Sequence, residues 1–287
     1  MIPYEFEYKQ AGSVDEAVSL LSEHGYDAKL LAGGHSLIPA MKLRLSAPKV
    51  LIDVSGVSGL ADISESDGQL HIGALTTHRR VEISDLVKQH CGVLAETAGR
   101  IGDPQVRNKG TIGGSIAHAD PAADYPALVL ALNATIHLTG PSGSRSIAAD
   151  DFFQDFFATA LNDDEVITHV SFPVLEGGAG AAYAKFANPA SRYAVVGVAA
   201  KVTVQGGVCT EARVAITGAA SHAFRATNVE EALTDNTLDE DTIKAALDGK
   251  FNEADLMSDL SGSAAYRAHL CAVMGKRALL QAAERAG

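Results

Sequence analysis

Two glycine pairs constrain this chain more than any other feature of its sequence. The first lies in AGGHS, residues 32–36, after a short apolar run, and the second lies in TIGGS, residues 111–115. Because glycine has no Cβ, each pair presents closely spaced backbone N–H donors with no side chain in front of them. A diphosphate fits such a loop, since its charges need several donors at short range. The hydroxyls of Ser36, Thr111 and Ser115 can add donors.

Other interpretations of these loops remain open at this point. A lone glycine pair most simply makes a turn, although two loops of one kind weaken that interpretation. The sequence contains neither G-x-G-x-x-G after a strand nor G-x-x-x-x-G-K-[ST]. The alternative is a serine hydrolase using Ser36, because GHSLI (34–38) has the first glycine and the serine of a G-x-S-x-G elbow. His118 and Asp124 could complete its triad, but Ile38 replaces the second glycine.

Composition indicates a globular protein and argues against several classes of partner. The 287 residues, of which 47% are hydrophobic, are enough for two ordinary domains. The net charge of −12 argues against broad contact with nucleic acid or anionic membranes. No apolar run approaches the roughly 18 to 20 residues that span a bilayer. The opening MIPYEFEYKQ lacks the features of a secretory signal, so we expect a cytoplasmic protein.

Cysteine and histidine give no metal signature. Cys91, Cys209 and Cys271 are widely separated and form no C-x-x-C, so we expect three reduced thiols packed in the interior. The histidines form no H-x-x-x-H or H-E-x-x-H, so no helix face is expected to present two ligands one turn apart. We therefore expect neither a metal ion nor an iron–sulfur cluster on this chain.

Periodicity predicts an α+β protein that begins with a helix and a small βαβ-like unit. Ser13 and Glu16 have capping-box spacing at the start of an amphipathic helix, and Gly25 can end it. Two short apolar runs, 28–32 and 49–55, then predict strands with a compact connection. Two hairpins follow, at 60–76 and 134–149, with helices between them at 79–89 and 93–101. A short helix at 150–157 and a strand at 165–173 complete this part.

Residues 102–127 lie between those helices and the second hairpin, and their Gly, Pro and Asp content predicts a long functional loop. A glycine-rich hinge is predicted at 174–182, so we expect a domain at 1–176, with subdomains of about 1–56 and 57–176, and a second domain at 177–287. In the second domain three antiparallel strands precede helices. These strands are predicted at 182–188, 192–205 and 209–219.

Three segments carry a resemblance to a known family: AKLLAGGHSLIPAMKLRL (28–45), DPQVRNKGTIGGSIAHADPAADYPA (103–127) and KFANPASRYAVVG (185–197). They resemble the FAD-binding medium subunit of aerobic carbon monoxide dehydrogenases and related molybdenum hydroxylases, the xanthine dehydrogenase family. The resemblance covers essentially the whole chain. It implies a two-part FAD-binding domain of the PCMH or vanillyl-alcohol-oxidase type and a small C-terminal flavoprotein domain.

The resemblance also implies which residues bind FAD. Ten would wrap its diphosphate: Ala32, Gly33, Gly34, His35, Ser36, Thr111, Ile112, Gly113, Gly114 and Ser115. Asp124 would accept hydrogen bonds from its sugar-like hydroxyls, and Ile167 would pack against it. Lys185 would lie near the pyrimidine end of the flavin, and Tyr193 would cover the ring. Each of these four has a purely structural alternative. Asp124 could cap a helix and Ile167 could be a core residue. Lys185 could be a solvated lysine, and Tyr193 could be ordinary strand packing.

By the same resemblance, this chain would be the flavin subunit of a larger oxidoreductase. Electrons would leave the substrate at a molybdenum pterin cofactor on a large subunit and cross [2Fe-2S] clusters on a small subunit. FAD on this chain would pass them to an external acceptor. A dimer of heterotrimers is implied, and the substrate could be carbon monoxide, an aldehyde or an N-heterocycle. Ser115 and Arg192 depart from the residues common in relatives, and a docking module without cofactor is a third alternative.

Overall fold

The first helix begins and ends where the sequence predicts. The computed structural model describes residues 2–287. In it, α1 (Val14–His24) is capped by the Ser13 hydroxyl, which accepts a hydrogen bond from Glu16 N at 3.1 Å. Gly25 ends the helix with a positive φ of 54°, a conformation that glycine adopts without strain. The buried face of α1 consists of Ala17, Val18 and Leu21.

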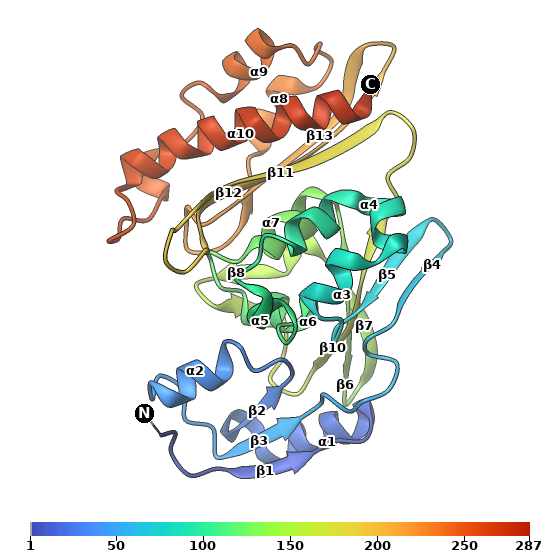
Figure 1. Ribbon diagram of the computed structural model, residues 1–287, viewed down its shortest axis with the longest axis vertical. Helices are drawn as coiled ribbons and strands as arrows, with labels where there is room; N and C mark the ends of the chain where they lie inside the picture. The colour runs from blue at the N-terminus through green and yellow to red at the C-terminus, as the bar shows by residue number, and fades with distance from the viewer. Residues whose placement is uncertain (1) are drawn as a thin grey trace.

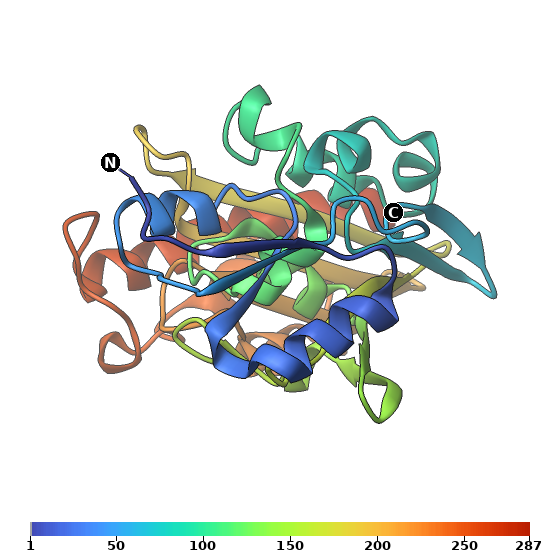
Figure 2. The same ribbon diagram turned by 90° about the horizontal axis from the view of Figure 1, so that it is seen from below.

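The N-terminal strands form a small parallel sheet. Its order is β1 (Glu7–Gln10), β3 (Val50–Asp53), β2 (Ala28–Leu31), and a short helix, α2 (Leu37–Lys42), connects β2 to β3. The predicted βαβ-like unit is therefore confirmed. Figure 1 shows these strands and α1 at the lower end of the molecule, and Figure 2, seen from below, shows them facing the viewer. The AGGHS segment follows the carboxyl end of β2 directly, as ligand-binding loops of α/β units commonly do.

A five-stranded antiparallel sheet forms the centre of the molecule (Figure 1). Its strands in spatial order are β4 (Ile63–Ser66), β5 (Gln69–Gly73), β10 (Val166–Pro173), β6 (Thr135–Gly140) and β7 (Gly143–Ala148). Both predicted hairpins are confirmed, and β10 lies between them. The apolar side chains of alternating positions pack with the helices into the largest core, which includes Leu70, Ile72, Leu138, Val170 and Phe172.

Two helices, α3 (His78–Ile83) and α4 (Asp85–Ala98), follow this sheet's first hairpin, so the predicted helical type is right there. Their boundary lies at Ser84, earlier than the sequence indicated. Inside α4 the backbone is non-helical at Cys91, with φ −156° and ψ 66°, which falls in the gap between the two predicted helices.

The segment predicted as a long loop is mostly helical. Within 102–127 the chain forms α5 (Pro104–Arg107), α6 (Ile112–His118) and the start of α7 (Asp124–Ala131). Caps rather than apolar periodicity begin the first two helices. Asp103 accepts a hydrogen bond from Val106 N at 2.9 Å, and Thr111 accepts one from Gly114 N at 3.1 Å. A seven-residue helix is too short to show a clear period, so the loop prediction was wrong here.

The short helix predicted at 150–157 is also wrong. Beyond one 3₁₀ turn at Ala149–Asp151, the chain forms two small strands, β8 (Phe153–Asp155) and β9 (Ala158–Thr159). Consecutive phenylalanines favour extended backbone, and Phe157 makes the turn between the strands with φ 52°.

The C-terminal unit is an antiparallel sheet of four strands. These are β11 (Ala179–Ala187), β12 (Ala194–Gln205), β13 (Val208–Thr217) and β14 (Phe224–Arg225), in that order. The prediction of three strands missed β14, whose two residues are too short to give a pattern. The helices are α8 (Thr227–Leu233), α9 (Glu240–Leu247) and α10 (Ala264–Ala286), and α10 runs along β11 and β12 (Figure 1).

The three cysteines are buried and unpaired, as predicted. Across residues 2–287, no helix is both long and apolar enough to cross a bilayer.

Polar contacts fasten the C-terminal sheet to the central unit. The Thr217 hydroxyl lies 2.7 Å from the carbonyl oxygens of both Pro121 and Ala123, just before α7. Arg213, which is buried, donates to Leu130 O at the other end of α7 and to Asp150 Oδ1 at 2.6 Å. The segment that follows the second glycine motif is therefore held against the C-terminal sheet.

Candidate cofactor site

The first glycine loop presents free backbone donors. Among the described residues, no hydrogen-bond acceptor is positioned for the N–H groups of Gly33, Gly34, His35 and Ser36. Gly34 has φ +71°, which turns the chain from β2 into α2 and which other residues rarely adopt. His35 is exposed, and its ring nitrogen Nδ1 lies 3.1 Å from Gly33 O. Four consecutive unpaired donors are an arrangement suited to an anion.

The second glycine loop differs, because its N–H groups are already bonded within the chain. Ile112 N donates to Thr76 O and Gly113 N to Ala74 O, at 3.0 and 2.9 Å. Gly114 N donates to the Thr111 hydroxyl, and Ser115 N donates to Thr111 O at 3.0 Å. The expectation that both loops offer free N–H donors is therefore wrong for this one.

The second loop offers instead a stretch of exposed backbone without a side chain. Gly114 is exposed, and a Cβ added there would meet only the Thr111 hydroxyl, at 2.8 Å. Gly113 is buried, and an added Cβ would press against Ala74. Ile112 is fully buried and belongs to the main core. Of the five motif residues, Gly114 and the partly exposed Ser115 thus face outward.

The two glycine loops touch each other. A Cβ added to Gly33 would overlap with the carbonyl group of Lys109, next to the Gly110 backbone, just before the second motif. Gly110 O in turn accepts a hydrogen bond from His78 N at 2.9 Å. Burial lowers the pKa of His78 to about 4, with smaller contributions from His35 and Arg107. The neutral imidazole packs against Gly110, where an added Cβ would overlap with the ring.

Tyr193 reaches the first loop from the C-terminal unit. It precedes β12, in a turn where Arg192 has φ 62° and Asn188 N donates to Tyr193 O at 2.8 Å. Its side chain lies close enough to Ser36 for the serine hydroxyl to affect the pKa of the phenol, and no hydrogen bond joins the two side chains in the described part of the chain. Burial raises the pKa of the phenol, as does the Asp120 charge, while Ser36 acts in the opposite direction. Figure 1 shows this connection descending on the side of the molecule where α2 lies.

Asp124 and Lys185 form a buried ion pair. The Lys185 ammonium lies 3.0 Å from Asp124 Oδ2, each side chain is only 5% exposed, and the ammonium also donates to Arg100 O. Tyr183 donates its hydroxyl to Asp124 Oδ1 at 2.5 Å. Burial raises the pKa of Asp124, and Lys185 and Tyr183 oppose that shift. Asp124 is not a helix cap, because Ala123 holds that position in α7, and Lys185 is not a solvated lysine.

Ile167 and Ala32 lie in apolar packing. Ile167 is buried on β10, pairs with Leu138 and belongs to the main core, so its contact with a cofactor stays a prediction. Ala32 is partly buried against the N-terminal core. Of the predicted site residues, the structure thus brings the two glycine loops into contact and places Tyr193 close to Ser36.

The family follows from comparison with known proteins. Residues 4–175 match the family described as the FAD binding domain in molybdopterin dehydrogenase, and residues 181–282 match the CO dehydrogenase flavoprotein C-terminal domain. The chain belongs to this family of FAD-binding flavoproteins. The family assignment predicted from the resemblance of three segments is thus confirmed, as is the α+β fold with an FAD-binding domain followed by a C-terminal flavoprotein domain.

Similar proteins match this flavoprotein over its whole length. It is 40% identical over 279 residues to the carbon monoxide dehydrogenase medium chain of Hydrogenophaga pseudoflava, covering 97% of each chain. It is also 40% identical to the 6-hydroxypseudooxynicotine dehydrogenase complex subunit alpha of Paenarthrobacter nicotinovorans, covering 100% of this chain and 97% of the relative.

Solved structures agree with these matches. A carbon monoxide dehydrogenase of Hydrogenophaga pseudoflava that lacks the Mo-pyranopterin moiety superposes with a TM-score of 0.96, at 42% identity and 99% coverage of both chains. Quinoline 2-oxidoreductase of Pseudomonas putida 86 superposes with a TM-score of 0.92, at 33% identity, covering 100% of this chain and 99% of the other.

The serine hydrolase alternative is wrong. In this flavoprotein both carboxylate oxygens of Asp124 are bonded to Tyr183 and Lys185, so the predicted third member of a triad is engaged elsewhere. The His118 ring packs at 4.9 Å from that of Phe157. No described hydrogen bond joins His118 to Ser36, and the family is not one of hydrolases.

Sequence reasoning missed Tyr183 and Arg100. Tyr183 lies two residues before Lys185 on β11, so strand alternation places both side chains on one face, and that signal was available. Arg100 gives no such signal, because its contact with Tyr183 O at 3.0 Å joins residues 83 positions apart.

Proposed function

We propose that this chain is the FAD-binding subunit of a molybdenum hydroxylase complex, where it passes electrons by means of FAD from [2Fe-2S] clusters of a small subunit to an external acceptor. The observation that carries the proposal is the run of four unpaired N–H donors at Gly33–Ser36, in a chain of the FAD-binding family. In a chain of net charge −12, such local donors are what an anionic diphosphate needs.

The residues around the loops have complementary roles in this proposal. The four N–H groups hold the diphosphate, and the bare surface at Gly114 lets it approach the second loop. Tyr193, which is 43% exposed beside Ser36, covers the flavin ring and excludes water from it. Asp124 accepts hydrogen bonds from the cofactor's hydroxyls, and Lys185 balances its charge. FAD supplies the electron-transfer chemistry when bound.

The assembly around the chain is part of the same proposal. A relative is named as a medium chain and another as a complex subunit, which supports partners carrying the molybdenum pterin cofactor and the iron–sulfur clusters. We extend this to a dimer of heterotrimers in the cytoplasm, where three unpaired thiols would stay reduced. Relatives at 40% identity are named for different substrates, so the substrate is set by the partner that binds it.

Absorbance spectroscopy tests the proposal on the purified complex and on the chain reconstituted with FAD. We expect a flavin spectrum with one FAD per chain that dithionite bleaches. A colourless chain that still assembles with its partners would instead support the docking-module alternative. A protein that takes up no FAD, either alone or in the complex, would contradict the proposal.

A further inference from the structure

Tyr183 is buried, and its hydroxyl makes a specific hydrogen bond to the site residue Asp124. Its side chain is 2% exposed, and its hydroxyl donates to Asp124 Oδ1 at 2.5 Å. Asp124 begins α7 in the central unit, whereas Tyr183 lies on β11 of the C-terminal sheet. The hydrogen bond therefore crosses the junction between the two units.

The neighbouring strand makes room for this hydroxyl. Gly197 on β12 pairs with Lys185 on β11, and a Cβ added to Gly197 would overlap with the Tyr183 hydroxyl oxygen. Any larger residue there would displace the hydroxyl from Asp124. The Tyr183 hydroxyl thus occupies the space that a side chain at position 197 would fill.

The carboxylate of Asp124 keeps capacity for a ligand. Oδ1 accepts from Tyr183 and Oδ2 accepts from the Lys185 ammonium, so each oxygen retains one lone pair. Two fixed donors leave the carboxylate one orientation, and they stabilise its charged form in a buried site.

We propose that Tyr183 is a positioning residue for the cofactor: with Lys185 it holds the Asp124 carboxylate in one orientation and in its charged form, ready to accept hydrogen bonds from FAD hydroxyls. This inference rests on the proposed function. It assigns a role to a residue whose effect on FAD passes through Asp124.

The test compares Tyr183→Phe with Tyr26→Phe in the assembled complex. Tyr26 is 82% exposed and lies before the start of β2, whereas the first glycine loop follows the end of β2, so it controls for loss of a phenol hydroxyl. For Tyr183→Phe we expect the FAD dissociation constant to rise about tenfold, the usual scale for a hydrogen bond to a charged group. FAD release on acidification should also begin at a higher pH, because the carboxylate loses a donor that favours its charged form.

A double-mutant cycle separates positioning from packing. If Tyr183 acts through the charge of Asp124, Tyr183→Phe should change FAD affinity little in an Asp124→Asn background. Gly197→Ala should mimic Tyr183→Phe, since it displaces the hydroxyl while keeping it in the protein. Thermal unfolding is measured on every variant to confirm folding.

Several results would overturn the inference. Tyr183→Phe could match Tyr26→Phe in both FAD affinity and release pH, or its effect could persist unchanged with Asp124→Asn. A lower unfolding temperature with unchanged FAD affinity and release pH would show that the hydroxyl serves only stability. If the parent complex itself bound no FAD, the proposed function would fail instead.

Discussion

Gly33 and Gly114 each belong to a glycine pair, but their surroundings differ. The missing side chain of Gly33 lets the Lys109 backbone approach, whereas the space at Gly114 opens outward beside Thr111. Gly33→Ala should therefore lower the thermal unfolding temperature, at a cost of about 1–3 kcal/mol, together with FAD uptake. Gly114→Ala should cost less stability, because only the Thr111 hydroxyl, 2.8 Å from the added Cβ, has to shift, but it should weaken FAD binding about tenfold. Calorimetry and FAD titration measure both, and full flavin occupancy in both variants would contradict the placement.

Tyr193 can be tested by removing its ring. Since the phenol lies beside Ser36 and is still 43% exposed, Tyr193→Ala should leave the fold and FAD binding largely intact. An aromatic contact that favours one redox state of the flavin over the other by ~0.5–1.5 kcal/mol contributes to its potential, so its loss should shift the two-electron potential by about 10–30 mV. Tyr193→Phe should keep the parental potential within a few millivolts. A redox titration with an unchanged potential for Tyr193→Ala would remove the covering role.

The residues that sequence reasoning found and missed differ in a physical way. Each glycine motif is one continuous segment of the sequence, so its residue types alone predicted an anion site. The pairing of Asp124 with Lys185 and Tyr183 depends on β11 passing the first residue of α7, which no local pattern encodes. Sequence also could not tell that the N–H groups of 112–115 find acceptors in Ala74, Thr76 and Thr111.

At the scale of elements, predictions succeeded where an apolar pattern extended over several helical turns or where the turn residues were characteristic of one turn type. The helix after Ser13 has three buried positions at helical spacing, and the hairpin turn at Asp67 and Gly68 has positive φ at both residues, as a tight two-residue turn requires. The helices α5 and α6 are fixed by caps and tertiary contacts, so their composition looked like that of a loop.

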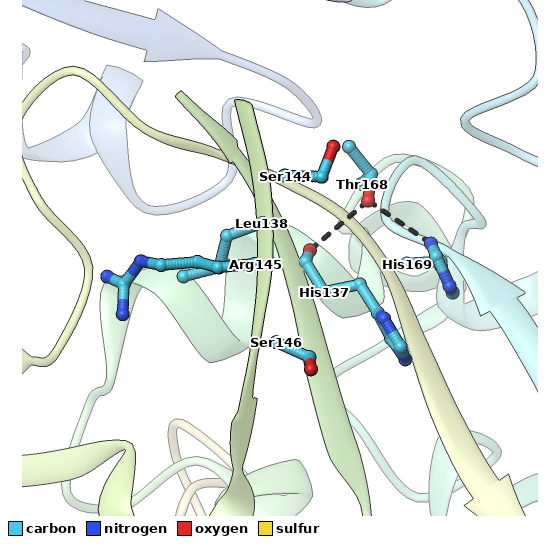
Figure 3. Close-up of a pocket in the computed structure, with 7 residues that line it drawn as sticks. All are labelled: His137, Leu138, Ser144, Arg145, Ser146, Thr168 and His169. Atoms are coloured by element: carbon cyan, nitrogen blue, oxygen red, sulfur yellow. Dashed lines mark hydrogen bonds between the residues drawn. The ribbon is translucent and has the colours of Figure 1, made fainter. Parts of the chain in front are cut away.

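The central sheet carries three histidines on adjacent strands. His71 Nδ1 lies 2.7 Å from Ser171 Oγ, which lies 2.9 Å from His137 Nε2, and the His137 and His169 rings stack with centroids 4.0 Å apart. His137 and His169 line a cavity of about 280 Å³ together with hydroxyl side chains and Arg145. Figure 3 shows these lining residues. Burial lowers the pKa of His169 to about 4, and the neighbouring histidines act in the same direction.

This cluster predicts a loss of stability in acid. The folded state holds His169 neutral, while the unfolded chain takes up a proton near pH 6.5, so the free energy of unfolding should fall as the pH drops from 6.5 towards 4. His169→Gln should remove about 1 kcal/mol of that fall, a value reduced for solvent screening. The exposed His269→Gln is the control. Parallel pH curves for parent and His169→Gln in denaturant unfolding would refute this.

At the scale of the whole molecule, the site is assembled from three units. β2 and its loop come from the N-terminal sheet, Gly114 and Asp124 from the central unit, and Tyr193 and Tyr183 from the C-terminal sheet. Contacts such as Thr217 to Pro121 and Ala123 hold the central and C-terminal units together over more than 90 positions in sequence. Domain order could be predicted from sequence, but the convergence of the units could not, because it depends on packing between them.

Amide hydrogen exchange with and without FAD tests the central claim most directly. If the first glycine loop holds the diphosphate through its unpaired N–H groups, FAD should slow exchange at Gly33, Gly34, His35 and Ser36. The amides of 112–115, which are already bonded within the chain, should change much less. Unchanged exchange at residues 33–36 in a complex that has bound FAD would contradict the account.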